Sequence, residues 1–465
     1  MIRGKRDVMK KEIKKICNLV IVLFIGIIVG FLLMVGVYAI PVDRMVKHSE
    51  SAAKALCDMQ KIDITANEEQ WCGFGVDTFT DSLMISTAIC DSGENIIHRA
   101  MKNQRIEYGL FNAYENLMKY YGINQKGEGK ITKYEQYKGY SYARYWNGYL
   151  VVIKPLLYLF DYNIIIIMNY FFQFSLVFII IAIMVKKKMG AYVFTFVYVM
   201  GCICITTTSR CLQFSNIVYI TLISMIVLLV YGEQLEKKGL TIYLFMIIGM
   251  CVGYFDILTY PLLTLGMPLT LCLILDKYTI KESLGKVVRY SAVWVFGYGG
   301  IWSGKWILAS ILTNQNVIEN AIKSIKYRMD SEINISCNTV IPDESFNAGR
   351  EIGEWIEEFT CSDVLVRNIY GMFNYIIMSV FFVMLIIMLF LIYERRRGIT
   401  MRVLCENIPF MIVAIMPFVW YIALQNHSFS HYFFTYRILS VTIFSIFCML
   451  IKLVNDITKE IDMKK

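Results

Sequence analysis

Two carboxylates stand four residues apart in a polar stretch of the sequence. Asp77 and Asp81 enclose three residues that include Thr78 and Thr80, and a helix or a strand would put both carboxylates on one face. Such a pair can act as a general base for a hydroxyl group or bind a divalent cation. The alternative is a helix N-terminus, at which Thr78 or Thr80 and Asp81 cap residues 82–88. Catalysis and capping both fit the spacing.

An arginine among aromatic residues is the second candidate. Arg144 is followed by Tyr-Trp-Asn-Gly-Tyr, with Trp146 near the start of that run. A guanidinium group can bind a phosphate through two hydrogen bonds, while a ring such as that of Trp146 contacts a sugar or an apolar chain. A membrane-surface aromatic belt with a snorkelling arginine has the same appearance.

Two further ionisable residues lie in otherwise apolar sequence. Arg210 ends one apolar stretch and Asp256 interrupts another. Because an ionisable group at membrane depth costs roughly a few kcal/mol, it usually faces a cavity or a partner. We therefore expect both residues to bind substrate. The alternative is a buried ion pair between Asp256 and Arg210 that fixes helix packing.

Two histidines and an arginine lie close together near the end of the chain. His427 and His431 are four residues apart and precede Arg437. The spacing would allow two metal ligands on one helical face, but the glutamate of an HExxH motif is missing. Binding of a phosphate or a sugar by these three side chains fits better. The 13 cysteines form no CxxC pair in a loop, so no metal ligand is assigned and a divalent cation stays an optional cofactor.

Apolar stretches of membrane-spanning length separate these candidates. Hydrophobic residues make up 57% of the 465 residues and the mean hydropathy is +0.52, which is more than a soluble chain can bury. A bilayer core about 30 Å thick needs roughly 20 apolar residues per helix. The sequence predicts an all-α polytopic membrane protein with about ten transmembrane helices. The predicted spans are 17–40, 162–185, 190–209, 213–231, 240–255, 257–275, 288–312, 370–393, 408–424 and 433–454.

Lysine and arginine clusters fall at every second junction between the predicted spans. Because cytoplasmic loops are rich in these residues, both termini are predicted to be cytoplasmic in a multi-pass protein of the cell membrane. The net charge of +9 is explained by these loops and by anionic membrane lipid, so nucleic acid is not an expected partner. The predicted segments are a basic N-terminus with the first span (1–40), an external loop with an interfacial helix (41–161), spans two to seven (162–312), a second external loop (313–369) and three spans with a cytoplasmic tail (370–465).

The external loops carry their own local patterns. Helical patterning is expected at residues 44–60, 97–120 and 348–359, and an exposed turn at 126–130. Residues 150–160 are apolar but too short to span a bilayer, so we predict an interfacial or re-entrant helix there.

The arrangement resembles the type C glycosyltransferases, and local sequence patterns also resemble uncharacterised multi-span proteins of Gram-positive bacteria. The resemblance is carried by Asp77 and Asp81 after the first span, Arg144 near the interfacial helix, and His427, His431 and Arg437 late in the chain. It implies transfer of a sugar from a polyprenyl-phosphate-linked donor to a glycan or cell-wall acceptor outside the cytoplasm. Asp77 or Asp81 would then be the catalytic base, and the other candidates would bind substrate.

Two other classes remain open from the sequence. A transporter or flippase of lipid-linked glycans would place ionisable residues at the bilayer midplane and commonly shows paired repeats with broken helices. No internal repeat is evident here, and the polar residues collect on one side of the predicted membrane. A non-enzymatic membrane scaffold is disfavoured by the intramembrane Asp256.

Overall fold

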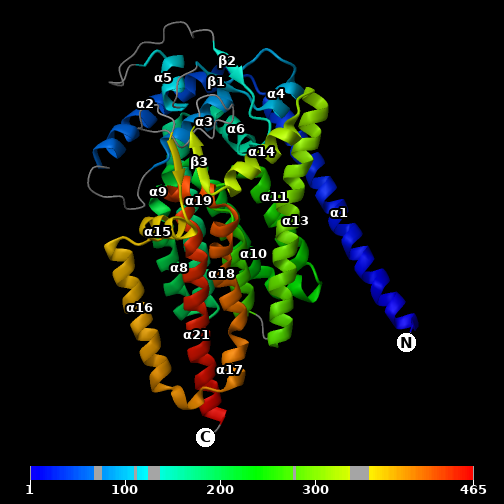
Figure 1. The fold of residues 1–465 in the computed structure, drawn as a ribbon, viewed down its shortest axis with the longest axis vertical. Helices are drawn as coiled ribbons and strands as arrows, with labels where there is room; N and C mark the ends of the chain where they lie inside the picture. The colour runs from blue at the N-terminus through cyan, green and yellow to red at the C-terminus, as the bar shows by residue number, and fades with distance from the viewer. Residues whose placement is uncertain are drawn as a thin grey trace.

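The computed structural model describes residues 2–66, 76–108, 113–123, 137–275, 279–335 and 355–463. Helices make up most of this part of the chain, together with two short two-stranded antiparallel sheets. Figure 1 shows a long helical bundle with a separate layer of short elements at its upper end, built from residues 43–159. Both chain ends lie at the opposite, lower end of the molecule.

The upper layer contains the loop that follows the first helix. Its elements are α2 (Asp43–Ala66), α3 (Thr78–Ile89), α4 (Ile96–Lys102), β1 (Arg105–Glu107), α5 (Ala113–Tyr120), β2 (Lys138–Tyr140) and α6 (Leu150–Leu159). The helices predicted at 44–60 and 150–160 are confirmed. The helical patterning predicted over 97–120 is confirmed in α4 and α5 and wrong at β1, because Asn103 takes a left-handed conformation that ends α4, and β1 then pairs with β2. The turn predicted at 126–130 lies outside the described residues.

Six helical segments of the described chain are long and apolar enough to cross a membrane. They lie in α1 (Ile2–Tyr38), α7 (Tyr162–Lys186), α10 (Leu212–Lys237), α16 (Tyr375–Glu394), α17 with α18 (Met401–Glu406, Ile408–Ala423) and α20 to α21 (Tyr432–Thr435, Leu439–Met463). Shorter apolar helices include α8 (Gly190–Cys202), α11 (Thr241–Phe255) and α12 (Leu263–Leu275). The protein is thus an all-α membrane protein, and the count of ten spans stays a prediction.

Several predicted spans are interrupted where the backbone turns. The predicted helix at 190–209 divides at Cys204, whose φ of 55° is left-handed, and α9 (Ile205–Arg210) follows.

The long α13 (Ile280–Thr313) leads into α14 (Val317–Met329). The remaining elements are α15 (Cys361–Met372), α19 (Gln425–Ser430) and the 3-10 turns η1 (Arg396–Gly398) and η2 (Tyr436–Ile438).

The second predicted external loop also contains a hairpin. The strands β3 (Glu332–Ile335) and β4 (Trp355–Glu358) are antiparallel, with Glu332 opposite Glu358. The helix predicted at 348–359 is therefore wrong over the four residues of β4, because their backbone groups pair across the hairpin. Residues 348–354 lie outside the described part of the chain.

Glycines bring α11 and α13 into backbone contact. A Cβ atom added to Gly249 would overlap the carbonyl oxygen of Trp294, and one added to Gly297 would overlap that of Met246. Gly253, one turn after Gly249, approaches α13 in the same way. Small residues four apart permit such close packing of helices in a membrane, where the hydrophobic effect between helices is lost. The two helices therefore form a closely packed pair.

We expect Gly297→Ala to destabilise the protein by a few kcal/mol (~2–4), because the added methyl group forces α11 and α13 apart. Gly299→Ala is the matched control on the same helix, since a Cβ there meets nothing within 4 Å. It should be neutral or stabilising by about 1 kcal/mol through helix propensity. Thermal unfolding of the purified variants in one detergent measures both, and equal melting temperatures would contradict the packing argument.

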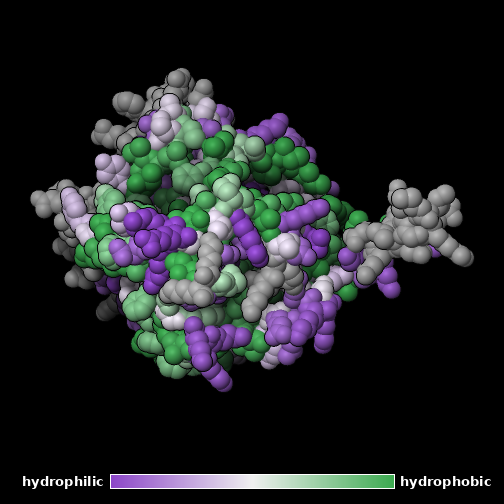
Figure 2. Space-filling view, turned by 90° about the horizontal axis from the view of Figure 1, so that it is seen from below, coloured by the Kyte–Doolittle hydropathy of each residue, from purple (hydrophilic) through white to green (hydrophobic). Residues whose placement is uncertain are grey.

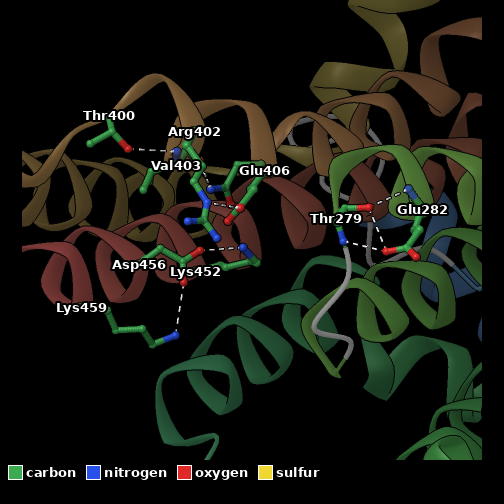
Figure 3. Close-up of polar contacts among 10 residues, drawn as sticks. Thr279, Glu282, Thr400, Arg402, Val403, Glu406, Lys452, Asp456 and Lys459 are labelled. Carbon is green, nitrogen blue, oxygen red and sulfur yellow. Dashed lines mark hydrogen bonds and ion pairs between the residues drawn. The ribbon is translucent and has the colours of Figure 1, made fainter. Parts of the chain in front are cut away.

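The lower end of the molecule is polar. Figure 2 shows this face, where hydrophilic side chains are spread between hydrophobic flanks. In Figure 3, Thr279 and Glu282 form the capping box that begins α13, and Asp456 accepts from Lys452 at 2.6 Å and from Lys459 at 3.3 Å. Such pairs within one helix near the surface are each worth roughly 0–1 kcal/mol, so they contribute little to the stability of this end.

Candidate functional site

Asp77 is the N-cap of α3. Its carboxylate accepts hydrogen bonds from the backbone N–H of Thr80 at 2.9 Å and from the Thr80 hydroxyl at 2.7 Å. The backbone N–H of Asp77 donates to Sγ of Cys211, the residue before α10, at 3.2 Å. Asp77 therefore caps α3. The cap that the sequence suggested, at Thr78 or Thr80 with Asp81, is wrong in its residues because the helix already begins at Thr78.

Asp81 points away from its own helix terminus and towards α10. Its two carboxylate oxygens accept from the backbone N–H groups of Leu212 and Gln213, each at 3.0 Å, and Tyr162 donates to it at 3.4 Å. Helix N-termini expose unpaired N–H groups and a partial positive charge, which a carboxylate neutralises. Asp81 is 0% exposed, and burial raises the pKa of its carboxyl to about 7, an effect larger than the lowering by the two N–H groups.

Arg437 lies in η2 and is also fully buried. Its Nε donates to the carbonyl of Ile203 at 2.9 Å, which the break between α8 and α9 leaves outside helical pairing. Nη1 donates to the carbonyl of Phe433 at 3.2 Å, while Nη2 has no hydrogen-bond partner among the described residues. The guanidinium carbon lies 4.5 Å from the ring centroid of Phe214 and 5.8 Å from that of Tyr260.

The surroundings of Arg437 bring the acidic candidates together. We call Cys211, Phe214, Tyr260 and Arg437 the Arg437 cluster. Cys211 is within electrostatic range of Asp81, Asp77 and Arg437. Tyr260 is within electrostatic range of Arg437 and Asp256, and its hydroxyl donates to the carbonyl of Phe214 at 2.6 Å. Two carboxylates are therefore near Cys211 and a third is near Tyr260, and Arg437 is within range of both residues.

Asp256 ends α11 and organises the loop that follows. It accepts from the backbone N–H of Thr259 at 2.8 Å and from its hydroxyl at 2.6 Å. Arg210, at the end of α9, is exposed, so the buried pair of Asp256 with Arg210 that the sequence allowed is not formed. Arg210 instead lies within electrostatic range of Tyr162.

The two histidines adjoin the Arg437 cluster through aromatic contacts. The rings of His427 and His431 are 4.6 Å apart, and both lie near Phe434, which in turn contacts Phe214 at 6.0 Å. Both histidines are buried, and Nδ1 of His431 is 3.1 Å from the carbonyl oxygen of His427. In the residues described here, no group of three His, Cys, Asp or Glu side chains could hold a metal ion.

The segment around Arg144 is fixed by hydrogen bonds to α13. Trp146 is 0% exposed, and its indole N–H donates to the carbonyl of Ile301 at 2.7 Å. The carbonyl of Arg144 accepts from Trp306 at 2.8 Å, and its guanidinium carbon lies 4.7 Å from the ring centroid of Tyr142. Trp146 therefore holds the segment in place, and Arg144 lies over aromatic rings as the sequence suggested.

Gly148 lets this segment approach the end of α11. Its N–H donates to the carbonyl of Tyr254 at 2.9 Å, and a Cβ at Gly148 would lie 2.5 Å from that oxygen. The contact brings the segment close to Asp256, two residues further along. Figure 1 shows α9 and α19 where the bundle meets the upper layer.

Sequence reasoning missed two buried lysines, of which Lys305 joins the upper layer to the bundle and Lys154 joins two helices within the upper layer. Lys305 of α13 donates to the carbonyl of Met101 near the end of α4 at 2.9 Å, and Lys154 of α6 donates to that of Ala88 near the end of α3 at 2.6 Å. Cations suit helix C-termini, where carbonyl groups are unpaired. The signal was present, because a lysine inside the apolar span predicted at 288–312 needs a partner.

These elements define a helical membrane protein with buried charges gathered where the bundle meets its upper layer. No family model, no curated protein and no solved structure matches this chain. The functional interpretation therefore depends on the chemistry of the residues themselves.

Proposed function

We propose that this protein is a membrane glycosyltransferase that moves a sugar from a polyprenyl-phosphate-linked donor to a glycan or cell-wall acceptor outside the cytoplasm. The observation that carries the proposal is that Asp77, Asp81 and the buried Arg437 all lie within electrostatic range of Cys211, while Asp256 and Arg437 both lie within range of Tyr260. Both termini would be cytoplasmic, since they lie at the end opposite the upper layer and the N-terminal segment is strongly basic.

Arg437 suits the leaving group of this reaction. A lipid-linked sugar phosphate carries an anion next to an apolar tail, and a guanidinium binds a phosphate through a planar fork. Nη2 of Arg437 is buried without a partner in the described chain, so it can donate to a phosphate oxygen without giving up a protein hydrogen bond. Charge stabilisation of this kind lowers the barrier as the phosphate departs.

Asp81 is the better of the two candidate bases. The acceptor oxygen attacks the anomeric carbon, its proton passes to the carboxylate, and the bond from carbon to phosphate oxygen breaks with its electron pair on the phosphate. Direct displacement inverts the anomeric carbon. A base is most effective when its pKa is near the working pH, and burial raises that of Asp81 to about 7. Asp77 is the second candidate, and His427, His431, Arg144 and Arg210 would contact the donor or the acceptor.

The competing proposal is a transporter or flippase of lipid-linked glycans, with a non-enzymatic scaffold as a third. The ionisable candidates gather at one end of the bundle rather than at its middle, which favours chemistry at a surface over passage through the membrane. The buried, incompletely paired Arg437 favours binding of an anion over a scaffold.

Two assays on the purified protein separate the proposals. Proteoliposomes are given synthetic polyprenyl-phosphate hexoses together with a digest of bacterial cell-wall glycan, and released polyprenyl phosphate is measured by mass spectrometry. We expect release that depends on the digest. Movement of the lipid-linked sugar between leaflets without release would instead identify a transporter.

A further inference from the structure

Three buried hydrogen-bonding groups around Trp302 have no partner in the described part of the chain. They are the hydroxyls of Tyr145 and Tyr298 and the indole N–H of Trp302, none of which has a partner among the residues that the structure describes. The ring of Trp302 lies 5.6 Å from that of Tyr145 and 5.0 Å from that of Tyr298. We call these three residues the Trp302 cluster.

Neighbouring side chains of the same types show what is unusual here. Trp294, Tyr298, Trp302 and Trp306 follow one another at four-residue intervals along α13, with rings 5.1, 5.0 and 6.1 Å apart. The indole N–H of Trp294 donates to the hydroxyl of Thr264, and that of Trp306 donates to the carbonyl of Arg144. Within the described chain, the donors of Tyr298 and Trp302, the two middle residues of this row, are the ones without a partner.

Unpaired donors of this kind are costly. Each buried polar group left without a partner costs about 1–3 kcal/mol, and buried tyrosine hydroxyls and tryptophan N–H groups normally find one. Three on adjoining rings at one place point to a partner that is not part of the protein.

The chemistry of the Trp302 cluster favours a carbohydrate. Its groups are neutral donors, two of which can also accept, and each is carried on an aromatic ring. A sugar ring offers hydroxyls for the donors and apolar C–H faces for the rings. A lipid tail would leave the donors unpaired, and inorganic phosphate would make no use of the rings.

The cluster also adjoins the charged site. Tyr298 is within electrostatic range of Asp256 and of Arg328 of α14, and the guanidinium carbon of Arg328 lies 5.8 Å from the ring centroid of Tyr145. Asp256 is also within range of Tyr260 in the Arg437 cluster. One carboxylate thus lies between the Trp302 cluster and the buried arginine.

We infer that Tyr145, Tyr298 and Trp302 form a carbohydrate-binding subsite, with the three unpaired groups donating to sugar hydroxyls and the rings contacting the sugar face. This inference extends the proposed transferase function. It depends on that function for the origin of the sugar, which would be either the hexose of the donor or part of the acceptor. The subsite itself depends on the geometry of these side chains.

The test measures binding apart from transfer. Methyl glycosides of the common hexoses and N-acetylhexosamines are added to the purified protein in detergent, and saturation-transfer NMR records which sugar protons contact it. At least one glycoside should bind. Tyr298→Phe and Trp302→Phe should each weaken its Kd tenfold or more, and Tyr145→Phe should act in the same direction.

Trp306→Phe is the matched control, because it removes an N–H that is already paired with the protein. It should lower the melting temperature and leave the sugar Kd unchanged. Tyr298→Phe and Trp302→Phe should instead keep or raise the melting temperature, since each removes a group that has no protein partner in the described chain. A purely structural role for the cluster would give the reverse pattern.

The outcomes separate this inference from the proposed function. If no glycoside binds the wild type, or if it binds Tyr298→Phe and Trp302→Phe with the wild-type Kd, the subsite is rejected, and polyprenyl phosphate release still decides the transferase. If a glycoside binds as expected but no donor is turned over, the subsite stands and the transferase is rejected. Wild-type transfer without glycoside binding rejects the subsite alone.

Discussion

Asp81→Asn is expected to abolish sugar transfer, with activity reduced by at least about 1000-fold, while the protein remains folded and membrane-inserted. The amide keeps the size of the carboxylate and its oxygen can still accept from one of the N–H groups of Leu212 and Gln213. It cannot take the proton of an acceptor hydroxyl. Polyprenyl phosphate release by wild type and variant, measured at equal amounts of folded protein, gives the result.

The pH dependence of the unfolding free energy is an independent test of the environment of Asp81, measured with the same Asp81→Asn variant. Burial raises the pKa of Asp81 from 3.8 to about 7, so the folded protein favours the protonated carboxyl. The stability that this carboxyl contributes is complete below about pH 4 and is lost as the pH rises through about 7. The unfolding free energy of the wild type relative to Asp81→Asn should therefore fall by a few kcal/mol (~2–4) over this range.

Asp77→Asn is the matched control for Asp81→Asn. Asparagine caps helices about as well as aspartate does, so α3 should keep its N-terminus, and transfer should stay within about threefold of the wild type. Loss of transfer in Asp77→Asn with normal turnover in Asp81→Asn would move the base to Asp77. Normal turnover in both variants would exclude the pair and direct attention to Asp256.

Arg437→Lys is expected to lower kcat/KM for a polyprenyl-phosphate sugar by about 100-fold, equivalent to about 3 kcal/mol. Lysine keeps the positive charge but loses the planar fork, so it cannot bond Ile203 and Phe433 in the present geometry and bind a phosphate at the same time. The effect should fall on use of the donor, and the KM of the acceptor should stay nearly unchanged.

Lysine substitutions of two other arginines serve as comparisons for Arg437→Lys. Arg144→Lys should weaken donor use by a smaller factor, about tenfold, because Arg144 keeps slight exposure and already lies over Tyr142. Arg210→Lys alters an exposed side chain and should change donor use by less than about threefold. If Arg437→Lys resembled Arg210→Lys, the phosphate role of Arg437 would be rejected while the transferase could stand.

The helical part of this fold is readable from the sequence because each apolar stretch carries its own length signal. The breaks within the predicted spans are harder to predict from the sequence. At Cys204, for example, the helix turns without any polar residue at that position that would mark the turn. The short strands were missed for a similar reason: β1 exists through its pairing with β2, more than 30 residues along the chain. The Gly249 and Gly253 spacing, in contrast, is visible in the sequence and indicates the close contact with α13.

The sequence was sufficient to predict which residues are candidates for the site, but it did not reveal which groups they contact. Asp81 and Arg437 attract attention as charges near apolar sequence, but the partner of Asp81 lies 131 residues away at the start of α10. No local pattern encodes that pairing. The unpaired donors of Tyr145, Tyr298 and Trp302 are likewise a property of the folded environment, because the same residue types at Trp294 and Trp306 are fully paired.

The closely packed pair α11 and α13 is the rigid side of the bundle, and α16 is the side that is less tightly held. Their backbones touch at Gly249 and Gly297, so sliding one past the other would drive atoms into overlap. In α16, every residue of which is described, no side chain is buried. Its apolar residues, such as Phe381, are only partly buried against the core, and a helix with little buried surface is displaced at a lower energetic cost than a deeply buried one. We therefore expect a rearrangement of the membrane part to displace α16 before it separates α11 from α13, whose contact fixes the positions of Asp256 at the end of α11 and Trp302 on α13.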